Sequence, residues 1–352
     1  MKRIENYDLS AHNTFGMKVR CALYIEYESV EELQKLPWKE LPQPIMHIGA
    51  GSNLLFTGDF PGTVLHSAVK YMKFVDMGLD EVLMTVGAGV VFDDFVARAC
   101  EVGLWGAENL SLIPGEVGAS AVQNIGAYGV EAKDIIAGVV CLDTTDWSKT
   151  IFKTPELAYG YRDSMFKHNK GRYIVTSVLF RLTRKHSPKL EYGGVRAALE
   201  EKWPGIATAV LTPQMVRDAI IGIRRAKLPD PAEKGSAGSF FKNPVIPREH
   251  YERIVDIANS RRPEEQAGEP VAVPHYDLPD GTVKVPAAWM IDSLGFRGAV
   301  SGGAKVYEKQ PLVIVNETGS ATPGDIISLE QSIISKVKEV YGVELHPEVE
   351  HV

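Results

Sequence analysis

The alternation of apolar and polar positions predicts short strands and helices along most of the 352-residue chain. Apolar runs bounded by glycine or polar residues predict strands, and apolar residues at helical spacing predict helices. Ser29 and Glu32 have the spacing of a capping box for the first of these helices. Up to residue 183 we expect strands at 44–48, 81–86, 137–143, 149–153 and 173–183, and helices at 30–36 and 92–102.

The pattern changes near residue 212. Thr212-Pro213 predicts the start of a helix whose apolar face is Met215, Val216, Ala219, Ile220 and Ile223. Further on we expect helices at 247–258, 286–294 and 323–341, and strands at 304–307 and 311–315. Thr322 and Asp325 can cap the start of the last helix, and Gly342 can end it. The loop 228–238 has the composition of a domain boundary, so the pattern predicts an α+β protein with at least two domains.

Composition and charge narrow the class of protein. A hydrophobic content of 45% and a charged content of 24% are typical of globular chains, and a net charge of −7 disfavours a nucleic-acid partner. Residues 1–16 lack the apolar core of a secretory signal, and no apolar run is long enough to span a bilayer. Cys21, Cys100 and Cys141 are too few and too far apart for a disulfide framework or a zinc site. We therefore expect a cytoplasmic protein with no metal and no membrane partner.

The first glycine-rich segment is 49-GAGSNLLF-56. Its glycines allow backbone amides to approach a ligand, and Ser52 and Asn53 can form hydrogen bonds with one. A dinucleotide-binding turn would continue into a long helix, which 54–62 does not predict, so that fingerprint is absent. A simple hairpin turn is the alternative.

A second run of small residues is 114-PGEVGASAVQNIGAYG-129. It could lie against a flat, extended ligand, or it could be a helix or turn that uses small residues for close packing. Gln123, Asn124 and Tyr128 add polar groups, which favours the ligand. A large planar cofactor would explain both glycine-rich segments together.

A third unusual stretch, 235-GSAGSFFKNP-244, combines small residues with two phenylalanines. It predicts a close backbone approach beside an apolar wall. Ser239 could be a hydrolase nucleophile, but the stretch lacks the G-x-S-x-G elbow and no histidine partner is evident.

Several motifs together resemble one family. Thr14-Phe15-Gly16, the two glycine-rich segments, 159-YGYRDSMFK-167, 223-IRRAKLPDP-231, 235–244 and 346-HPEV-349 resemble, in order, motifs of UDP-N-acetylenolpyruvoylglucosamine reductases. The resemblance implies a two-part FAD-binding domain of the vanillyl-alcohol-oxidase type, followed by a smaller α+β substrate domain. It implies subdomains at 1–68 and 69–225, a substrate domain at 226–325, and a C-terminal helix and strand at 326–352 that return to the active site.

The implied activity is reduction of UDP-N-acetylglucosamine enolpyruvate to UDP-N-acetylmuramate in peptidoglycan synthesis, by a monomer that uses NADPH and FAD. The resemblance assigns Arg162 to stabilise negative charge, Ser239 to donate a proton and Glu348 to assist at the substrate carboxylate. Without it, Arg162 would be interpreted as a surface ion pair with Asp163, and Glu348 as a solvated tail residue.

Binding residues follow from the same resemblance. The expected FAD contacts are Gly49, Ala50, Gly51, Ser52, Asn53, Gly115, Gly118, Ala119, Ser120, Asn124, Gly126 and Arg224. The expected substrate contacts are Tyr128, Tyr192, Lys227, Asn243 and Lys284, where Tyr192 marks the branch of the family with a tyrosine-bearing loop. Without the resemblance, Tyr192 would be a strand-end aromatic and the basic residues solvated charges. Lys227 or Lys242 could assist Ser239.

Two features limit the assignment. We place no site residue in the connection 264–276, and the chain ends soon after Glu348, without a longer tail to contact the flavin. Two other functions remain open: an FAD-dependent oxidase of a sugar or hydroxy acid, and a non-catalytic protein that binds a UDP-sugar or flavin.

Overall fold

The computed structural model describes residues 1–261 and 270–352, which separate into two compact units. Unit 1 comprises Met1–His12, Val19–Gly51 and Asp59–Ala226, and unit 2 comprises Asn13–Lys18, Ser52–Gly58 and Lys227–Val352. Each unit combines helices with sheets, so the predicted α+β class is confirmed. Part of the connection at 264–276 lies outside the described residues. No described helix is both long enough and apolar enough to cross a membrane.

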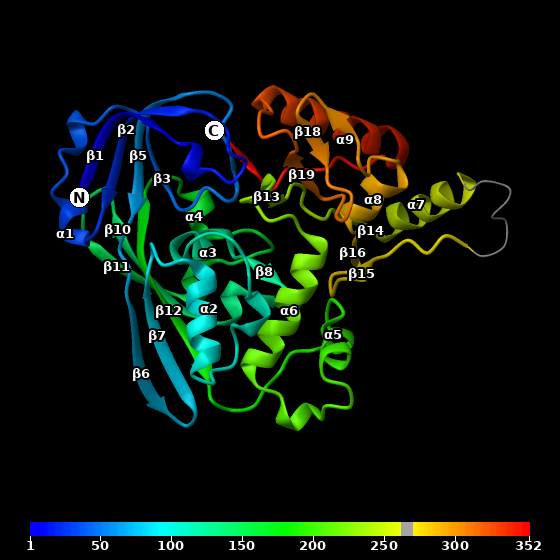
Figure 1. The fold of residues 1–352 in the computed structure, drawn as a ribbon, viewed down its shortest axis with the longest axis horizontal. Coiled ribbons are helices and arrows are strands. Elements are labelled where there is room, and N and C mark those ends of the chain that lie inside the picture. The colour runs from blue at the N-terminus through cyan, green and yellow to red at the C-terminus, as the bar shows by residue number, and fades with distance from the viewer. Residues whose placement is uncertain (262–269) are drawn as a thin grey trace. The chain divides into compact units, whose positions relative to one another are not determined.

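The first sheet of unit 1 has the strand order β1-β2-β5-β3 (Figure 1). β1 pairs antiparallel with β2, whereas β2 and β3 run parallel to β5. The central strand β5 is buried from its third residue onward, so it lacks the apolar–polar alternation that marks a half-exposed strand. The bounds are β1 Lys2–Asp8, β2 Arg20–Tyr27, β3 Ile45–Ile48 and β5 Phe60–Ser67.

The second sheet of unit 1 is antiparallel throughout, with the order β11-β10-β12-β7-β6 (Figure 1). It confirms the strands predicted at 81–86, 137–143, 149–153 and 173–183. The edge strand β6 is almost fully exposed and therefore carries no periodic apolar signal. The bounds are β6 Met72–Gly78, β7 Glu81–Gly87, β10 Ile136–Asp143, β11 Lys149–Lys153 and β12 Tyr173–Thr183.

Helix α2, Phe92–Glu101, covers this sheet as its apolar spacing predicts. Phe95 of α2 stacks on Phe180 of β12 with ring centroids 4.1 Å apart, and both side chains are fully buried. Helix α3, Val117–Gln123, contacts β12 and β7. The shorter helices are α1 Val30–Gln34 and α4 Met165–His168. Ser29 caps α1, but the Glu32 side chain accepts from the Glu28 amide, so only half of the predicted capping box is present.

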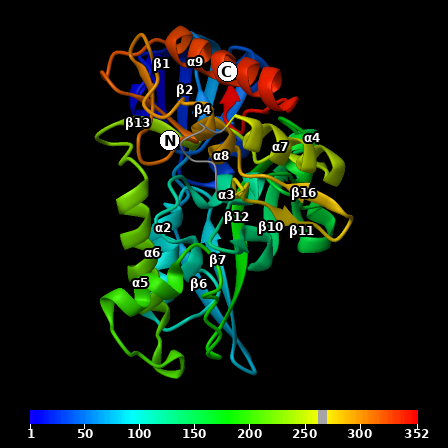
Figure 2. The ribbon, with the colours of Figure 1, turned by 90° about the vertical axis from the view of Figure 1, so that its right-hand side faces the viewer.

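Helices α5 and α6 lie side by side (Figures 1 and 2). They share one buried apolar cluster that includes Val195 and Leu199 of α5 with Val216 and Ile220 of α6. The Thr212 hydroxyl accepts a hydrogen bond from the Met215 amide at 3.2 Å, so the predicted helix start is confirmed. The bounds are α5 Val195–Lys202 and α6 Pro213–Lys227, and the 3₁₀ turns are η1 Ser10–His12, η2 Trp38–Glu40, η3 Glu108–Leu110, η4 Ala132–Asp134, η5 Thr154–Leu157 and η6 Thr208–Val210.

Unit 2 contains an antiparallel sheet of order β13-β19-β18-β17 and a smaller sheet of order β14-β16-β15. β19 begins at Val313 rather than at 311 because a turn, closed by the Val313 amide on the Gln310 carbonyl, precedes it. The bounds are β13 Gly235–Ser239, β14 Val245–Pro247, β15 Tyr276–Asp277, β16 Thr282–Lys284, β17 Val300–Ser301, β18 Ala304–Val306 and β19 Val313–Asn316. The remaining short strands of the chain are β4 Leu54–Leu55, β8 Gly126–Ala127, β9 Val130–Glu131 and β20 Glu350–His351.

Helix α9, Pro323–Tyr341, has the predicted bounds and caps. Thr322 and Asp325 form a reciprocal capping box, and Gly342 ends the helix in the left-handed region. One face of α9 is buried and contacts α7, Arg248–Ser260, and α8, Ala287–Ser293.

Candidate active site

The two glycine-rich segments lie against each other in unit 1. A Cβ built on Gly49 would be 3.3 Å from Glu116 Oε2 and 3.4 Å from the Ala119 Cβ. The absence of a side chain at Gly49 therefore lets Glu116 and Ala119 pack closely against it, and the expected approach of its backbone to a ligand stays a prediction.

The hairpin alternative for the first segment is wrong. The strand before it, β3, pairs with β5, and the strand after it, β4, pairs with β20. No helix follows the segment directly, which agrees with the missing dinucleotide fingerprint. Gly49, Ala50 and Gly51 belong to unit 1, and Ser52 and Asn53 belong to unit 2.

Part of the second segment is the helix α3, so close packing also contributes to its composition. A Cβ on Gly118 would be 2.9 Å from the Ala88 Cβ, closer than two such atoms can lie. The Ser120 hydroxyl donates to the Val117 carbonyl at 2.7 Å, and the Gly115 carbonyl accepts from the Phe92 amide at 3.0 Å. The FAD contacts expected from Gly115, Gly118, Ala119 and Ser120 stay predictions.

Two buried polar atoms near α3 fit a polar ligand. Gln123 Oε1 and the Tyr159 hydroxyl have no hydrogen-bond partner among the described residues. A buried polar group that lacks a partner is costly, so such atoms indicate a missing ligand or water. Together with the small residues of both segments, an orphaned acceptor and an orphaned hydroxyl suit a large cofactor with its own donors and acceptors, as FAD has.

Asn124 holds three segments of unit 1 together. It ends α3 with a left-handed φ of 45°, and its amide nitrogen donates to the Gly160 carbonyl at 2.8 Å and to Glu131 Oε2 at 3.0 Å. Its side-chain oxygen accepts from the Lys133 amide at 3.0 Å. The side chain therefore fixes the loop that begins at Gly160.

That loop carries Arg162. The residue has a left-handed φ of 55°, and its guanidinium donates to the Gly126 carbonyl at 3.1 Å and to the Asn124 carbonyl at 3.4 Å. Asp163, its alternative ion-pair partner, has an oxygen 2.8 Å from His168 Nε2, a hydrogen bond that lowers the pKa of Asp163. The structure thus brings Arg162 together with Asn124 and Gly126.

Tyr128, Tyr192 and Arg224 also lie together in unit 1. Tyr128 and Gly129 form the turn between β8 and β9, and a Cβ on Gly129 would be 3.3 Å from the Tyr192 Cβ. The Arg224 side chain lies close to the Tyr128 hydroxyl, and Arg224 Nε donates to the Leu112 carbonyl at 3.3 Å. Burial raises the pKa of Tyr128 and lowers that of Arg224. Tyr192 is 45% exposed, as a residue that meets a ligand in solution can be.

In unit 2, Ser239 is exposed at the end of β13. Its strand pairs with β19, and the register shifts between Ser236 and Ser239, where Gly238 has a φ of +72°. The Ser236 amide donates to the Thr14 carbonyl at 2.8 Å, so the motif at 14–16 lies beside this strand. The expected close backbone approach of the stretch is confirmed at Gly235, where a Cβ would be 2.3 Å from the Phe15 oxygen.

The C-terminal segment places Glu348 close to Ser239. The Glu348 amide donates to the Phe240 carbonyl at 2.8 Å, and Phe241 bridges to Pro347. Asn53 Nδ2 donates to the Glu348 carbonyl at 3.0 Å, and β20 runs parallel to β4. Within unit 2, Glu348 is therefore held both to Asn53 and to Phe240, the residue that follows Ser239. Phe240 and Phe241 are buried and form the predicted apolar wall.

The other expected substrate contacts of unit 2 are more dispersed. Asn243 Oδ1 accepts from the Ala287 amide at 3.0 Å at the start of α8. Lys284 lies in β16 with its Nζ 5.4 Å from the centre of the Tyr276 ring, and Lys227 is exposed at the end of α6. Their substrate contacts stay predictions.

Sequence reasoning missed Glu116 and His66, which lie beside Gly49 in unit 1. His66 Nε2 is 2.8 Å from Glu116 Oε1, and both side chains are about 10% exposed. The sequence does contain one signal for Glu116, because a glutamate is unusual inside a run of small residues. Its partner, 50 residues earlier, carries no local signal.

The contact at Gly235 leads to a stability prediction. We expect Gly235→Ala to destabilise the protein by more than about 2 kcal/mol, because the new Cβ meets backbone that cannot move aside easily. Gly238→Ala is the matched control: its Cβ meets open space, so only the left-handed φ is strained, at about 1–2 kcal/mol. Thermal unfolding of both variants measures the difference, and equal stability would show that the strand adjusts.

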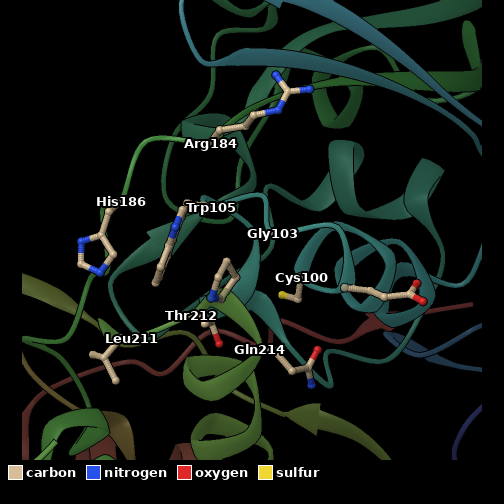
Figure 3. A pocket seen from close by; sticks show the side chains of 10 residues that line it. Cys100, Gly103, Trp105, Arg184, His186, Leu211, Thr212 and Gln214 are labelled. Atoms are coloured by element: carbon tan, nitrogen blue, oxygen red, sulfur yellow. The ribbon is translucent and has the colours of Figure 1, made fainter. Parts of the chain in front are cut away.

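Unit 1 also has a surface pocket. It is lined by the end of α2, the start of α6 and the segments between them, including Cys100, Trp105, His186 and Thr212 (Figure 3). None of the predicted site residues lines it, so we do not interpret it as the active site.

Known proteins resemble this chain over almost its full length. Residues 230–352 match the family model of the UDP-N-acetylenolpyruvoylglucosamine reductase C-terminal domain, and residues 21–146 match an FAD binding domain. A UDP-N-acetylenolpyruvoylglucosamine reductase of Bacteroides fragilis is 45% identical over 98% of both chains. The one from Porphyromonas gingivalis is 42% identical over 99% of this chain and 98% of its own.

A solved structure agrees with the fold. The UDP-N-acetylenolpyruvylglucosamine reductase of Thermus caldophilus superposes with a TM-score of 0.66 over 99% of this chain and 98% of its own, at 24% sequence identity. An FAD-binding fold followed by a smaller domain, as expected from the motifs, is thereby confirmed. The chain belongs to the UDP-N-acetylenolpyruvoylglucosamine reductase family.

Proposed function

We propose that this protein reduces the enolpyruvyl double bond of UDP-N-acetylglucosamine enolpyruvate to form UDP-N-acetylmuramate, with NADPH as the reductant and FAD as the bound cofactor. The product is a precursor of peptidoglycan, and we place the reaction in the cytoplasm. The observation that carries the proposal is the pairing of 346–348 with 240–242 in a chain of this family, which holds Glu348 beside Phe240, the residue that follows Ser239.

Bound FAD would supply the hydride chemistry that couples oxidation of NADPH to reduction of the carbon beta to the substrate carboxylate. The glycine-rich segments of this chain offer backbone amides and small residues for the cofactor to lie against. The residues that would hold it are Gly49, Ala50, Gly51, Ser52, Asn53, Gly115, Gly118, Ala119, Ser120, Asn124, Gly126 and Arg224.

Arg162 stabilises the negative charge that builds up on the substrate carboxylate during reduction. A guanidinium stays cationic and pairs with a carboxylate through two parallel hydrogen bonds. The carbonyls of Asn124 and Gly126 orient it before substrate arrives, so little reorganisation is needed in the transition state.

Ser239 donates the proton that completes the reduction. A hydroxyl is a weak acid, but a carbanion-like enolate is a strong enough base to take its proton. Glu348, on the neighbouring segment, assists polarisation or protonation of the substrate carboxylate. The substrate is anchored by Tyr128, Tyr192, Lys227, Asn243 and Lys284, whose cationic and hydroxyl groups suit a nucleotide diphosphate.

A single assay tests the proposal. The purified full-length protein should be yellow, release FAD on denaturation, and oxidise NADPH only when UDP-N-acetylglucosamine enolpyruvate is present. A colourless protein that cannot be reconstituted with FAD would contradict it. Oxygen consumption with a sugar or hydroxy acid, without use of NADPH, would support the oxidase alternative instead.

A further inference from the structure

A buried charged cluster lies directly behind the first glycine-rich segment. Glu116 precedes α3, and its Oε1 is 2.8 Å from Nε2 of His66 in β5. The other carboxylate oxygen, Oε2, is the atom that a Cβ on Gly49 would approach to 3.3 Å. One carboxylate oxygen of Glu116 therefore faces His66, and the other lies beside Gly49.

The second nitrogen of His66 faces another carboxylate. His66 Nδ1 is 3.1 Å from Glu26 Oε2 and 3.0 Å from the Tyr24 hydroxyl, both on β2. A neutral imidazole has one N–H and can donate to one of the two glutamates, whereas an imidazolium donates to both. Burial disfavours the charged ring, but the hydrogen bonds and charges of Glu116 and Glu26 outweigh it and raise the pKa of His66.

The other basic side chains around His66 do not supply the positive charge that His66 loses when it is deprotonated. The His12 ring in η1 lies 5.2 Å from the His66 ring, and burial, followed by the charge of His66, lowers the pKa of His12. His47 in β3 has a pKa of about 4, lowered by burial and then by His66. Lys2 in β1 lies over the ring of Tyr7, which is itself hydrogen-bonded to His12. His66 is thus the histidine of this cluster whose pKa is raised, whereas the pKa values of His12 and His47 are lowered.

We propose that Glu116 and His66 are positioning residues for the cofactor: Glu116 packs against Gly49, and the positive charge on His66 offsets the negative charge of Glu116 so that the FAD diphosphate can bind beside it. This inference rests on the proposed function, because it takes FAD to lie along the glycine-rich segments. It goes further in assigning control of FAD affinity to a charge behind the segment, rather than to a group that contacts the cofactor.

The sign of the pH effect follows from these charges. When His66 is protonated, its positive charge offsets the charge of one of the two carboxylates that it contacts, Glu116 and Glu26. When His66 loses its proton, an uncompensated carboxylate remains beside the segment and repels the anionic diphosphate. Affinity for FAD should therefore be highest below the pKa of His66 and fall as the pH rises above it, in a window that begins above about pH 6.5.

The test is a titration of flavin-free, full-length protein with FAD, followed by flavin fluorescence, between about pH 6 and pH 9. We expect the wild-type Kd to rise about tenfold across this range. His66→Gln should have a high Kd at every pH, like the wild type at pH 9. His66→Gln combined with Glu116→Gln should restore the low Kd at every pH, because only the Glu26 carboxylate remains, and the net charge then equals that of the wild type with His66 protonated.

His12→Gln is the matched control, since His12 lies in the same cluster but does not contact Glu116; it should keep the pH dependence of the wild type. If His66→Gln does not fold, the Glu116→Gln variant tests the inference by itself. Its Kd for FAD at pH 9 should be as low as that of the wild type at pH 6. Parallel pH profiles in the wild type and in a folded His66→Gln would overturn the inference while the proposed function stands. A wild-type chain that binds no FAD at any pH would overturn both.

Discussion

Ser239→Ala is expected to lower kcat by about 10²–10⁴-fold, the range that general acid catalysis typically contributes. The hydroxyl is exposed at the end of β13, and the variant removes only that group, so FAD should still bind. The loss should be confined to the half-reaction in which the substrate is reduced. Stopped-flow absorbance separates the two halves: NADPH should bleach the flavin at the wild-type rate, and the substrate should restore its colour slowly.

Two further variants test whether the loss of rate is due to the Ser239 hydroxyl itself. Ser239→Cys retains a group that can donate a proton, so it should recover part of the lost rate. Ser236→Ala changes a serine three positions earlier, in the same strand but buried, and should leave kcat nearly unchanged. Turnover at the wild-type rate in Ser239→Ala would remove the proton-donor role and leave the reductase assignment in place.

Arg162→Lys should lower kcat by about 10²–10³-fold although the positive charge is kept. A lysine ammonium is a point charge that cannot pair with a carboxylate in two parallel hydrogen bonds. It also cannot reproduce the geometry by which the guanidinium donates to the Gly126 and Asn124 carbonyls. Because charge accumulates mainly in the transition state, kcat should fall more than KM rises.

Arg172→Lys is the matched control for this substitution. Arg172 is an arginine of the same unit whose guanidinium pairs with Asp143 at 3.1 Å, and no predicted site residue takes part in that pair. Its replacement should leave kcat and KM close to the wild-type values. If Arg162→Lys raised KM and left kcat unchanged, Arg162 would bind the substrate without stabilising its transition state.

Arg162 in unit 1 and Glu348 in unit 2 are held in place by different kinds of hydrogen bond. Arg162 is oriented by carbonyls of the segment that follows α3, whereas Glu348 is held by main-chain bonds to Phe240 and by the Asn53 amide. Main-chain bonds do not depend on the side chain at position 348. Replacement of Glu348 should therefore change chemistry more than structure.

Local patterns determined much of the secondary structure. The last helix has its predicted bounds because its capping residues and its closing glycine lie within one turn of its ends. The strands at 149–153 and 173–183 also have their predicted bounds. In each case the decisive interactions join neighbours in the sequence, or depend on which side of a strand or helix is apolar.

Local sequence patterns did not determine the role of the small residues. The run at 114–129 could be interpreted as a ligand-facing backbone or as closely packed structure, and α3 with Gly118 against Ala88 shows that packing is part of the answer. A glycine is required wherever another atom comes near, and the sequence does not tell whether that atom belongs to the protein or to a ligand.

By itself the sequence determined the family, the class of fold and the type of chemistry, because these depend on motifs that are each contiguous in the chain. Only the tertiary structure decided which motifs meet. It places Thr14 and Phe15 beside 235–236, Asn53 and Glu348 beside Phe240, and His66 behind Gly49 through Glu116. The physical reason is that backbone pairing and buried charge pairs join residues tens to hundreds of positions apart, and no local pattern encodes such a contact.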